Sequence, residues 1–182
     1  GPVLGIMHAK DLDEAIEWQN STGFGLTAGI HTLDGEEITT WLDRVEAGNV
    51  YVNRGITGAI VQRQPFGGWK KSSVGPGAKA GGPNYVAQMG TWRERAELAP
   101  SLGVSISAQV QELLDAFRAN VHDEDYGWLS RAAEYDQRAW DKEFGRGHDH
   151  SGLRSEANIF RYRSTLEPVS YTHLTLPTNR EV

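Results

Sequence analysis

The feature that most constrains the fold is an alternation of strand-like and helix-like segments over residues 3–52. Apolar runs at 3–7, 26–32 and 50–52 predict three strands. Between them, apolar residues recur at helical spacing over 12–19, where Asp11 would cap the helix, and again over 38–45, where Gly48 would end it. This order predicts an α/β fold, with an open, parallel-type sheet and right-handed crossover helices.

Beyond residue 93 the pattern is mostly helical and predicts an extension of two helices and one strand. Ser105 would cap a helix over 105–121, whose Leu, Val and Phe stripe we interpret as a packing face rather than a cofactor site. A second helix is predicted over 129–140. Alternating residues over 158–163 predict a half-exposed strand.

Composition excludes several chemistries. The 182 residues include no cysteine, so disulfides, thiolate metal sites and a cysteine nucleophile cannot come from this chain. The net charge of −6 argues against a general nucleic-acid binder. Charges, Gly and Pro interrupt every long stretch, which predicts no membrane segment, and no secretory leader is visible.

Three motifs are weak evidence for a dinucleotide, phosphate or metal site. Residues 23–28 match G-x-G-x-x-A, but a helix is predicted before them and a strand after them, so a helix-ending turn is the better interpretation. Residues 75–82 lack the G-K-[ST] of a P-loop. A metal site at 148–150 (His-Asp-His) would need a second ligand cluster, which favours a polar loop, and no metal is predicted. The isolated histidines are His8, His31 and His122.

The informative segment is the glycine-rich stretch over 53–86. It contains the pattern P-F-G-G-x-K-x-S, met by Pro65, Phe66, Gly67, Gly68, Lys70 and Ser72. With the ordered matches at 1–3, 22–26 and 48–53, the segment resembles the C-terminal catalytic region of aldehyde dehydrogenases. The further match through Gly58, Ala59 and residues 81–85 resembles the L-glutamate γ-semialdehyde (1-pyrroline-5-carboxylate) dehydrogenase subfamily.

The resemblance implies an NAD-dependent enzyme that oxidises L-glutamate γ-semialdehyde to L-glutamate in proline degradation. In that family a Cys thiolate attacks the aldehyde, hydride passes to NAD, and a Glu-assisted water hydrolyses the thioester. Because this chain has no Cys and opens at the family's G-P-V, we expect a truncated C-terminal part. The catalytic Cys, the general-base Glu and the NAD-binding fold would lie upstream, so this chain alone would be inactive and binds no cofactor.

The resemblance also implies substrate-binding residues. Gly58 and Ala59 would donate backbone N–H groups to the substrate carboxylate, which needs no titrating charge. Phe66 would pack on the aliphatic stem of the substrate. The alternatives are turn geometry for Gly58 and core filling for Phe66.

The resemblance is close over residues 1–92, and 93–168 would form the extension. Residues 153–163 are similar to the extension of bifunctional proline-utilisation flavoenzymes, so FAD would be a second cofactor of such a parent; a monofunctional parent is the rival. A homo-oligomeric, cytoplasmic parent is expected, membrane-associated if bifunctional. Residues 169–182 read as a non-native or disordered tail.

Two other classes stay open. One is an aldehyde dehydrogenase for another substrate, which a bulky or β-branched residue in place of Gly58 would favour, and position 58 is glycine. The other is a non-catalytic interaction module that uses the α/β part as a scaffold. The reading frame upstream of residue 1 would distinguish the module from the enzyme.

Overall fold

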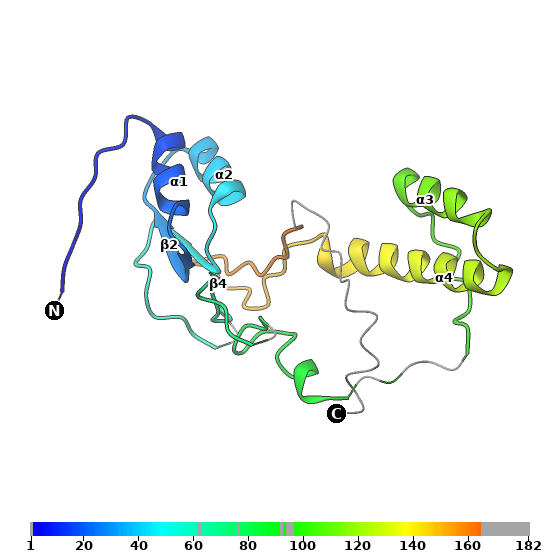
Figure 1. Cartoon of the computed structure of the whole chain (residues 1–182). Coiled ribbons are helices and arrows are strands. Elements are labelled where there is room, and N and C mark those ends of the chain that lie inside the picture. Colours follow the sequence, from blue (N-terminus) through cyan, green and yellow to red (C-terminus); the bar gives the residue numbers. More distant parts are fainter. Residues whose placement is uncertain (1, 62, 76, 92, 94–96, 165–182) are drawn as a thin grey trace, which may run out of the picture. The chain divides into compact units, whose positions relative to one another are not determined.

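The computed structural model describes residues 2–61, 63–75, 77–91, 93 and 97–164. It divides into two compact units (Figure 1). Unit 1 comprises Gly1–Glu97 together with His148–Phe160, and unit 2 comprises Leu98–Gly147 together with Arg161–Val182. Among the described residues, none of the helices is both long and apolar enough to cross a bilayer.

Unit 1 has the predicted α/β character. Its two longer strands, β2 and β3, pair in parallel, with Thr27 opposite Asn49 and Ile30 opposite Val52. Two short strands, β1 and β4, pair antiparallel. The elements are α1 (Leu12–Asn20), β1 (Phe24–Gly25), β2 (Thr27–Ile30), α2 (Gly35–Arg44), β3 (Asn49–Val52), β4 (Trp69–Lys70) and the 3-10 turn η1 (Ala87–Met89).

Both helices of unit 1 begin at an aspartate that caps them. The Asp11 carboxylate accepts a hydrogen bond from the Glu14 N–H at 2.9 Å, as the sequence predicts. Asp34 does the same for α2, accepting from the Glu36 N–H at 2.8 Å. These caps are local in sequence, so each fixes a helix start without help from distant residues.

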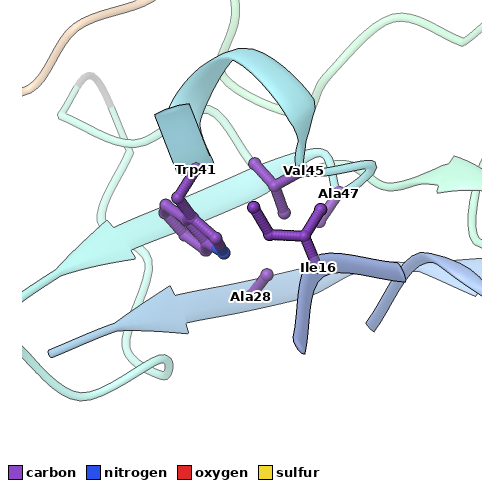
Figure 2. Packing of buried hydrophobic residues seen from close by; sticks show 5 residues of the cluster. All are labelled: Ile16, Ala28, Trp41, Val45 and Ala47. Carbon is purple, nitrogen blue, oxygen red and sulfur yellow. The ribbon is translucent and has the colours of Figure 1, made fainter. Parts of the chain in front are cut away.

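The core of unit 1 lies between the two helices and the β2–β3 pair. It consists of five buried residues that point toward one another in Figure 2: Ile16, Ala28, Trp41, Val45 and Ala47. Ile16 is 2% exposed and Trp41 3%. The Trp41 indole N–H donates to the Gln19 side-chain oxygen at 2.8 Å, so its burial leaves no unpaired donor.

The predicted strand over 3–7 is wrong. Residues 2–9 have no secondary structure, and the side chains of Val3 and Leu4 are 94% and 85% exposed. A strand requires a neighbour for its N–H and C=O groups, and no described segment pairs with this one. The open parallel sheet is accordingly reduced to the β2–β3 pair in the described part of unit 1.

Unit 2 contains helices α3 (Ala108–Arg118) and α4 (Asp123–Ala139), followed by the π-helical turn η2 (Trp140–Phe144). Helix α3 begins after Ser107, which caps it, rather than after Ser105. Of its apolar stripe only Leu114 is buried. Helix α4 begins six residues before the predicted position, in the acidic turn after His122. Backbone and hydroxyl donors of Leu102 and Ser101 lower the pKa of the Glu134 carboxyl in α4.

The predicted strand over 158–163 is also wrong. Burial alternates along it, but its only described ladder contact is the Phe160 bridge to His148, with N···O distances of 2.8 Å in both directions. Residues 148–160 were predicted to belong to the extension, but they pack with unit 1. The predicted tail at 169–182 lies outside the described residues.

Candidate functional site

The loop after β3 carries two of the predicted site residues, and its start is fixed by paired hydrogen bonds. Asn53 has φ 55°, and its side-chain amide donates to the Thr32 carbonyl at 2.8 Å and accepts from the Thr32 N–H at 3.0 Å. The Arg54 guanidinium lies over the Tyr51 ring, 5.3 Å from its centroid. These contacts therefore fix the direction in which the backbone leaves the end of β3. We define residues 54–64 as the anchor loop.

Gly58 and Ala59 lie in the middle of the anchor loop. Gly58 has φ +81°, a conformation that favours glycine, and nothing lies within 4 Å of where its Cβ would be. Neither amide donates a hydrogen bond to another described residue. Two neighbouring free N–H groups in such a turn can receive an anion such as a carboxylate. A Cβ has room at Gly58 but would be strained by the backbone angle.

Phe66, the third predicted residue, is held by its backbone while its ring stays partly open. Its N–H and C=O exchange hydrogen bonds with Ala80 at 3.0 and 2.9 Å. The side chain is 42% exposed. Core filling, the alternative role, therefore does not describe this residue within the described part of unit 1.

Lys79 organises the backbone around Phe66. Its ammonium donates to the Gly48 carbonyl at 2.5 Å, the Gly67 carbonyl at 2.6 Å and the Asn49 side-chain oxygen at 3.2 Å. Burial lowers the pKa of this amine to about 8, so it is still mostly charged at pH 7. The three donors of the ammonium thus match three oxygens and tie the start of β3 to the P-F-G-G segment.

The rest of the P-F-G-G-x-K-x-S pattern is structural. Lys70, at φ 52°, donates to the Thr22 carbonyl at 3.2 Å and pairs with Glu46 at 2.5 Å. The Ser72 hydroxyl accepts from the Gly25 N–H at 3.3 Å. This pattern therefore holds β1 and β4 together and supports the position of Phe66 rather than supplying reactive groups.

Sequence reasoning missed the contribution of segment 148–160 to this region. The Glu156 carboxylate lies 3.3 Å from Arg54 and 3.8 Å from Arg63, at the two ends of the anchor loop. The Asn158 side-chain oxygen accepts from the Gln64 amide at 3.1 Å. These partners are about a hundred positions apart in the chain, and no short motif links them. Only the alternation of polar and apolar residues around Asn158 hinted that the segment is half-buried.

The His-Asp-His motif forms a polar turn, as the sequence favours. One Asp149 oxygen accepts from the Ser151 N–H at 2.9 Å, its hydroxyl at 2.7 Å and the Gly152 N–H at 3.1 Å; the other accepts from the Asn158 N–H at 3.0 Å. These donors, the Ser151 hydroxyl above all, lower the Asp149 pKa to about 2. The His148 and His150 rings stack with centroids 5.9 Å apart.

A hollow of about 560 Å³ in unit 1 does not contain the predicted site residues. Its lining includes Arg63, Pro65, Gly81, His148, Asn158 and Phe160. Gly58 and Ala59 adjoin each other on the anchor loop and Phe66 follows that loop, and none of the three lines this hollow.

Residues 23–28, which match G-x-G-x-x-A, do not form a dinucleotide site. They follow α1 and contain β1, so a helix precedes them and strands follow. A pyrophosphate site needs the reverse order, with a helix N-terminus aimed at the phosphates. The geometry confirms the helix-ending turn and does not fit NAD.

Comparisons with known proteins give consistent matches. The family model described as "Aldehyde dehydrogenase family" matches residues 1–94. The "Bifunctional protein PutA" of Rhizobium meliloti is 47% identical over 93 residues, 50% of this chain and 7% of that protein. A "1-pyrroline-5-carboxylate dehydrogenase" of Staphylococcus epidermidis is 45% identical over 86 residues, 47% of this chain and 16% of that protein.

A solved structure extends the match into unit 2. Proline Utilization A (PutA) from Corynebacterium freiburgense is 61% identical with a TM-score of 0.77, and the match covers 90% of this chain and 16% of that protein. This chain thus spans less than a fifth of the length of each relative described here.

Proposed function

Because the chain belongs to the aldehyde dehydrogenase family, we propose that it supplies the substrate-anchoring part of an NAD-dependent dehydrogenase. That enzyme oxidises L-glutamate γ-semialdehyde to L-glutamate in proline degradation. The observation that carries this proposal is the 61% identity, over 90% of this chain, with a proline utilization protein. The matching 1-pyrroline-5-carboxylate dehydrogenase supports the same substrate.

In the proposed reaction this chain binds and orients the substrate. Backbone N–H groups of Gly58 and Ala59 hold the α-carboxylate, which fixes the distance from that end of the substrate to its aldehyde. Phe66 covers the aliphatic stem, for which its partly exposed ring is suited. The free amides and the left-handed Gly58 support the carboxylate role.

The chemical step itself needs groups that this chain lacks. NAD accepts the hydride in the parent enzyme, and residues 23–28 of this chain do not fit it, because a helix precedes them and strands follow. The sequence contains no Cys, so the nucleophilic thiolate comes from elsewhere in a longer protein. We therefore propose that the chain is one part of that protein and is inactive alone.

A bifunctional parent is favoured over a monofunctional one. The match with the Corynebacterium freiburgense protein continues through unit 2, whereas the match with the Staphylococcus epidermidis dehydrogenase covers 47% of this chain. Such a parent would also use FAD in a proline dehydrogenase part. A homo-oligomeric state and a cytoplasmic location remain proposals from the family resemblance.

The test is an exchange enzyme, defined as the Corynebacterium freiburgense protein with its matching segment replaced by this chain. We expect NAD-dependent oxidation of glutamate semialdehyde with kcat/KM within about tenfold of the unaltered protein, because substrate contacts are retained. Proline oxidation by the same molecule controls for folding of the rest. Intact proline oxidation with no glutamate semialdehyde oxidation would overturn the proposal.

A further inference from the structure

The anchor loop is tied down at its two ends and open in its middle. The amides of Gly58 and Ala59 lack described partners, and the loop's own backbone hydrogen bonds run from Arg63 and Gln64 to the Ile60 carbonyl, at 3.0 and 2.8 Å. The contacts that hold the two ends therefore contribute to the position of these two amides. Asn53 holds the backbone just before the loop, and segment 148–160 contacts both ends.

We infer that Glu156 is a positioning residue that sets the place of the Gly58 and Ala59 amides by holding Arg54 and Arg63 together. The inference rests on the proposed carboxylate-binding role of those amides. Each oxygen of the Glu156 carboxylate serves a different guanidinium: Oε2 is 3.3 Å from Arg54 and Oε1 is 3.8 Å from Arg63. The Glu156 carboxylate thus bridges the arginines at the two ends of the anchor loop.

Glu156 is itself held by a buried partner. Asn158 is 8% exposed, and its amide donates to Glu156 Oε1 at 3.1 Å and to the Ser151 hydroxyl at 3.0 Å. The Asn158 N–H donates to the Asp149 carboxylate at 3.0 Å. Glu156 therefore projects from a hydrogen-bonded platform, which limits how far the two arginines can move.

Global stability gains little from these ion pairs. The side chains of Glu156, Arg54 and Arg63 are 33%, 35% and 43% exposed, and solvent screens pairs of this kind strongly. A network that contributes little to folding can still restrict a loop whose two central amides make no hydrogen bond to another described residue. The expected signature of its loss is local, in loop mobility and in binding of the substrate carboxylate.

The test compares Glu156→Gln with Glu112→Gln in the exchange enzyme. Glu112 is an exposed glutamate on α3 in unit 2, so its substitution removes the same charge elsewhere. Two readouts are taken: hydrogen exchange of amides over 55–61, and KM with kcat for glutamate semialdehyde and for propanal. Propanal has no carboxylate and reports general damage.

We expect Glu156→Gln to speed exchange over 55–61 several-fold and raise KM for glutamate semialdehyde about three- to tenfold, less than outright loss of a hydrogen bond to a charged group. Its kcat, the KM for propanal and both Glu112→Gln readouts should stay within about twofold. Because the effect acts through the two arginines, Arg54→Gln with Arg63→Gln should reproduce it, and adding Glu156→Gln should change nothing more.

Unchanged exchange over 55–61 would overturn the inference, as would equal losses for both substrates. If exchange is faster but the KM for glutamate semialdehyde is unchanged, the KM of Ala59→Pro, which lacks one proposed donor, decides between two explanations. If Ala59→Pro raises that KM, the anchor exists and Glu156 does not position it, so the inference fails. If Ala59→Pro also leaves that KM unchanged, the proposed function of the loop fails, and the positioning role that rests on it falls too.

Discussion

Gly48→Ala should disrupt the junction between β3 and the P-F-G-G segment. A Cβ at Gly48 would lie 1.9 Å from the Gly67 carbonyl oxygen, 2.7 Å from the Gly68 Cα and 2.8 Å from the Gly67 carbonyl carbon. Contacts under 3.0 Å essentially do not occur, so one backbone segment must move by more than 1 Å. All three atoms are backbone, and no side-chain rotation relieves the clash.

The free energy of unfolding of unit 1 should fall by about 3 kcal/mol, the upper end of typical overpacking costs. The movement also threatens the Gly48 N–H bond to the Gly25 carbonyl, at 2.9 Å, and the two carbonyl bonds of Lys79. Gly35→Ala is the matched control, since nothing lies within 4 Å of its Cβ at the start of α2. That change should stabilise by about 0.4–1 kcal/mol.

The assay is urea unfolding of the 182-residue chain, followed by hydrogen exchange in peptides covering residues 27–52. Exchange separates unit 1 from unit 2, which tryptophan fluorescence would mix. An unfolding free energy for Gly48→Ala within about 1 kcal/mol of the Gly35→Ala value would refute the rigid junction, since the new methyl group meets backbone atoms at Gly48 and open space at Gly35.

Two further predictions concern stability. Ile16→Ala should lower the free energy of unfolding of unit 1 by about 2–5 kcal/mol in the same assay, because Ile16 is 2% exposed in the small core; a loss under about 1 kcal/mol would contradict that core. Asp149 has a folded-state pKa of about 2, below the ordinary 3.8, so its stabilising contribution is present above pH 4 and is lost as pH falls toward 2. Hydrogen exchange over 149–158 should accelerate across that window, and Asp149→Asn should remove the acceleration.

The elements that could be predicted from the sequence are those that local signals determine. Helix α1 begins at its predicted cap Asp11, apolar residues at helical spacing predicted both helices, and the parallel pairing of β2 with β3 follows from the crossover between them. The Asp34 cap of α2 was not predicted. The predicted strand over residues 3–7 is wrong because an apolar run forms a strand only when a partner strand is available. Ser105 failed as a cap because Ser107, two residues on, offers the same chemistry.

The site was predictable only in part. Gly58, Ala59 and Phe66 came from a family resemblance, and their proposed roles stay predictions. Gly48 looked like a helix stop, whereas α2 ends at Arg44 and Gly48 is needed where two backbones approach closely. Glu156 could not be found, because its partners Arg54 and Arg63 meet it only after the chain returns to unit 1.

The central claim is that the Gly58 and Ala59 amides bind the substrate carboxylate. The most direct test is Ala59→Pro in the exchange enzyme, which removes one N–H, against Ala59→Ser, which keeps it. Losing a hydrogen bond to a charged group costs about 1.5–3 kcal/mol, so kcat/KM for glutamate semialdehyde should fall roughly tenfold to a hundredfold. Proline also restricts Gly58, so an unchanged melting temperature is required. We predict that propanal oxidation changes much less than glutamate semialdehyde oxidation in Ala59→Pro, and that Ala59→Ser stays near the unaltered values. Equal losses for both aldehydes would contradict the carboxylate-binding role of these amides.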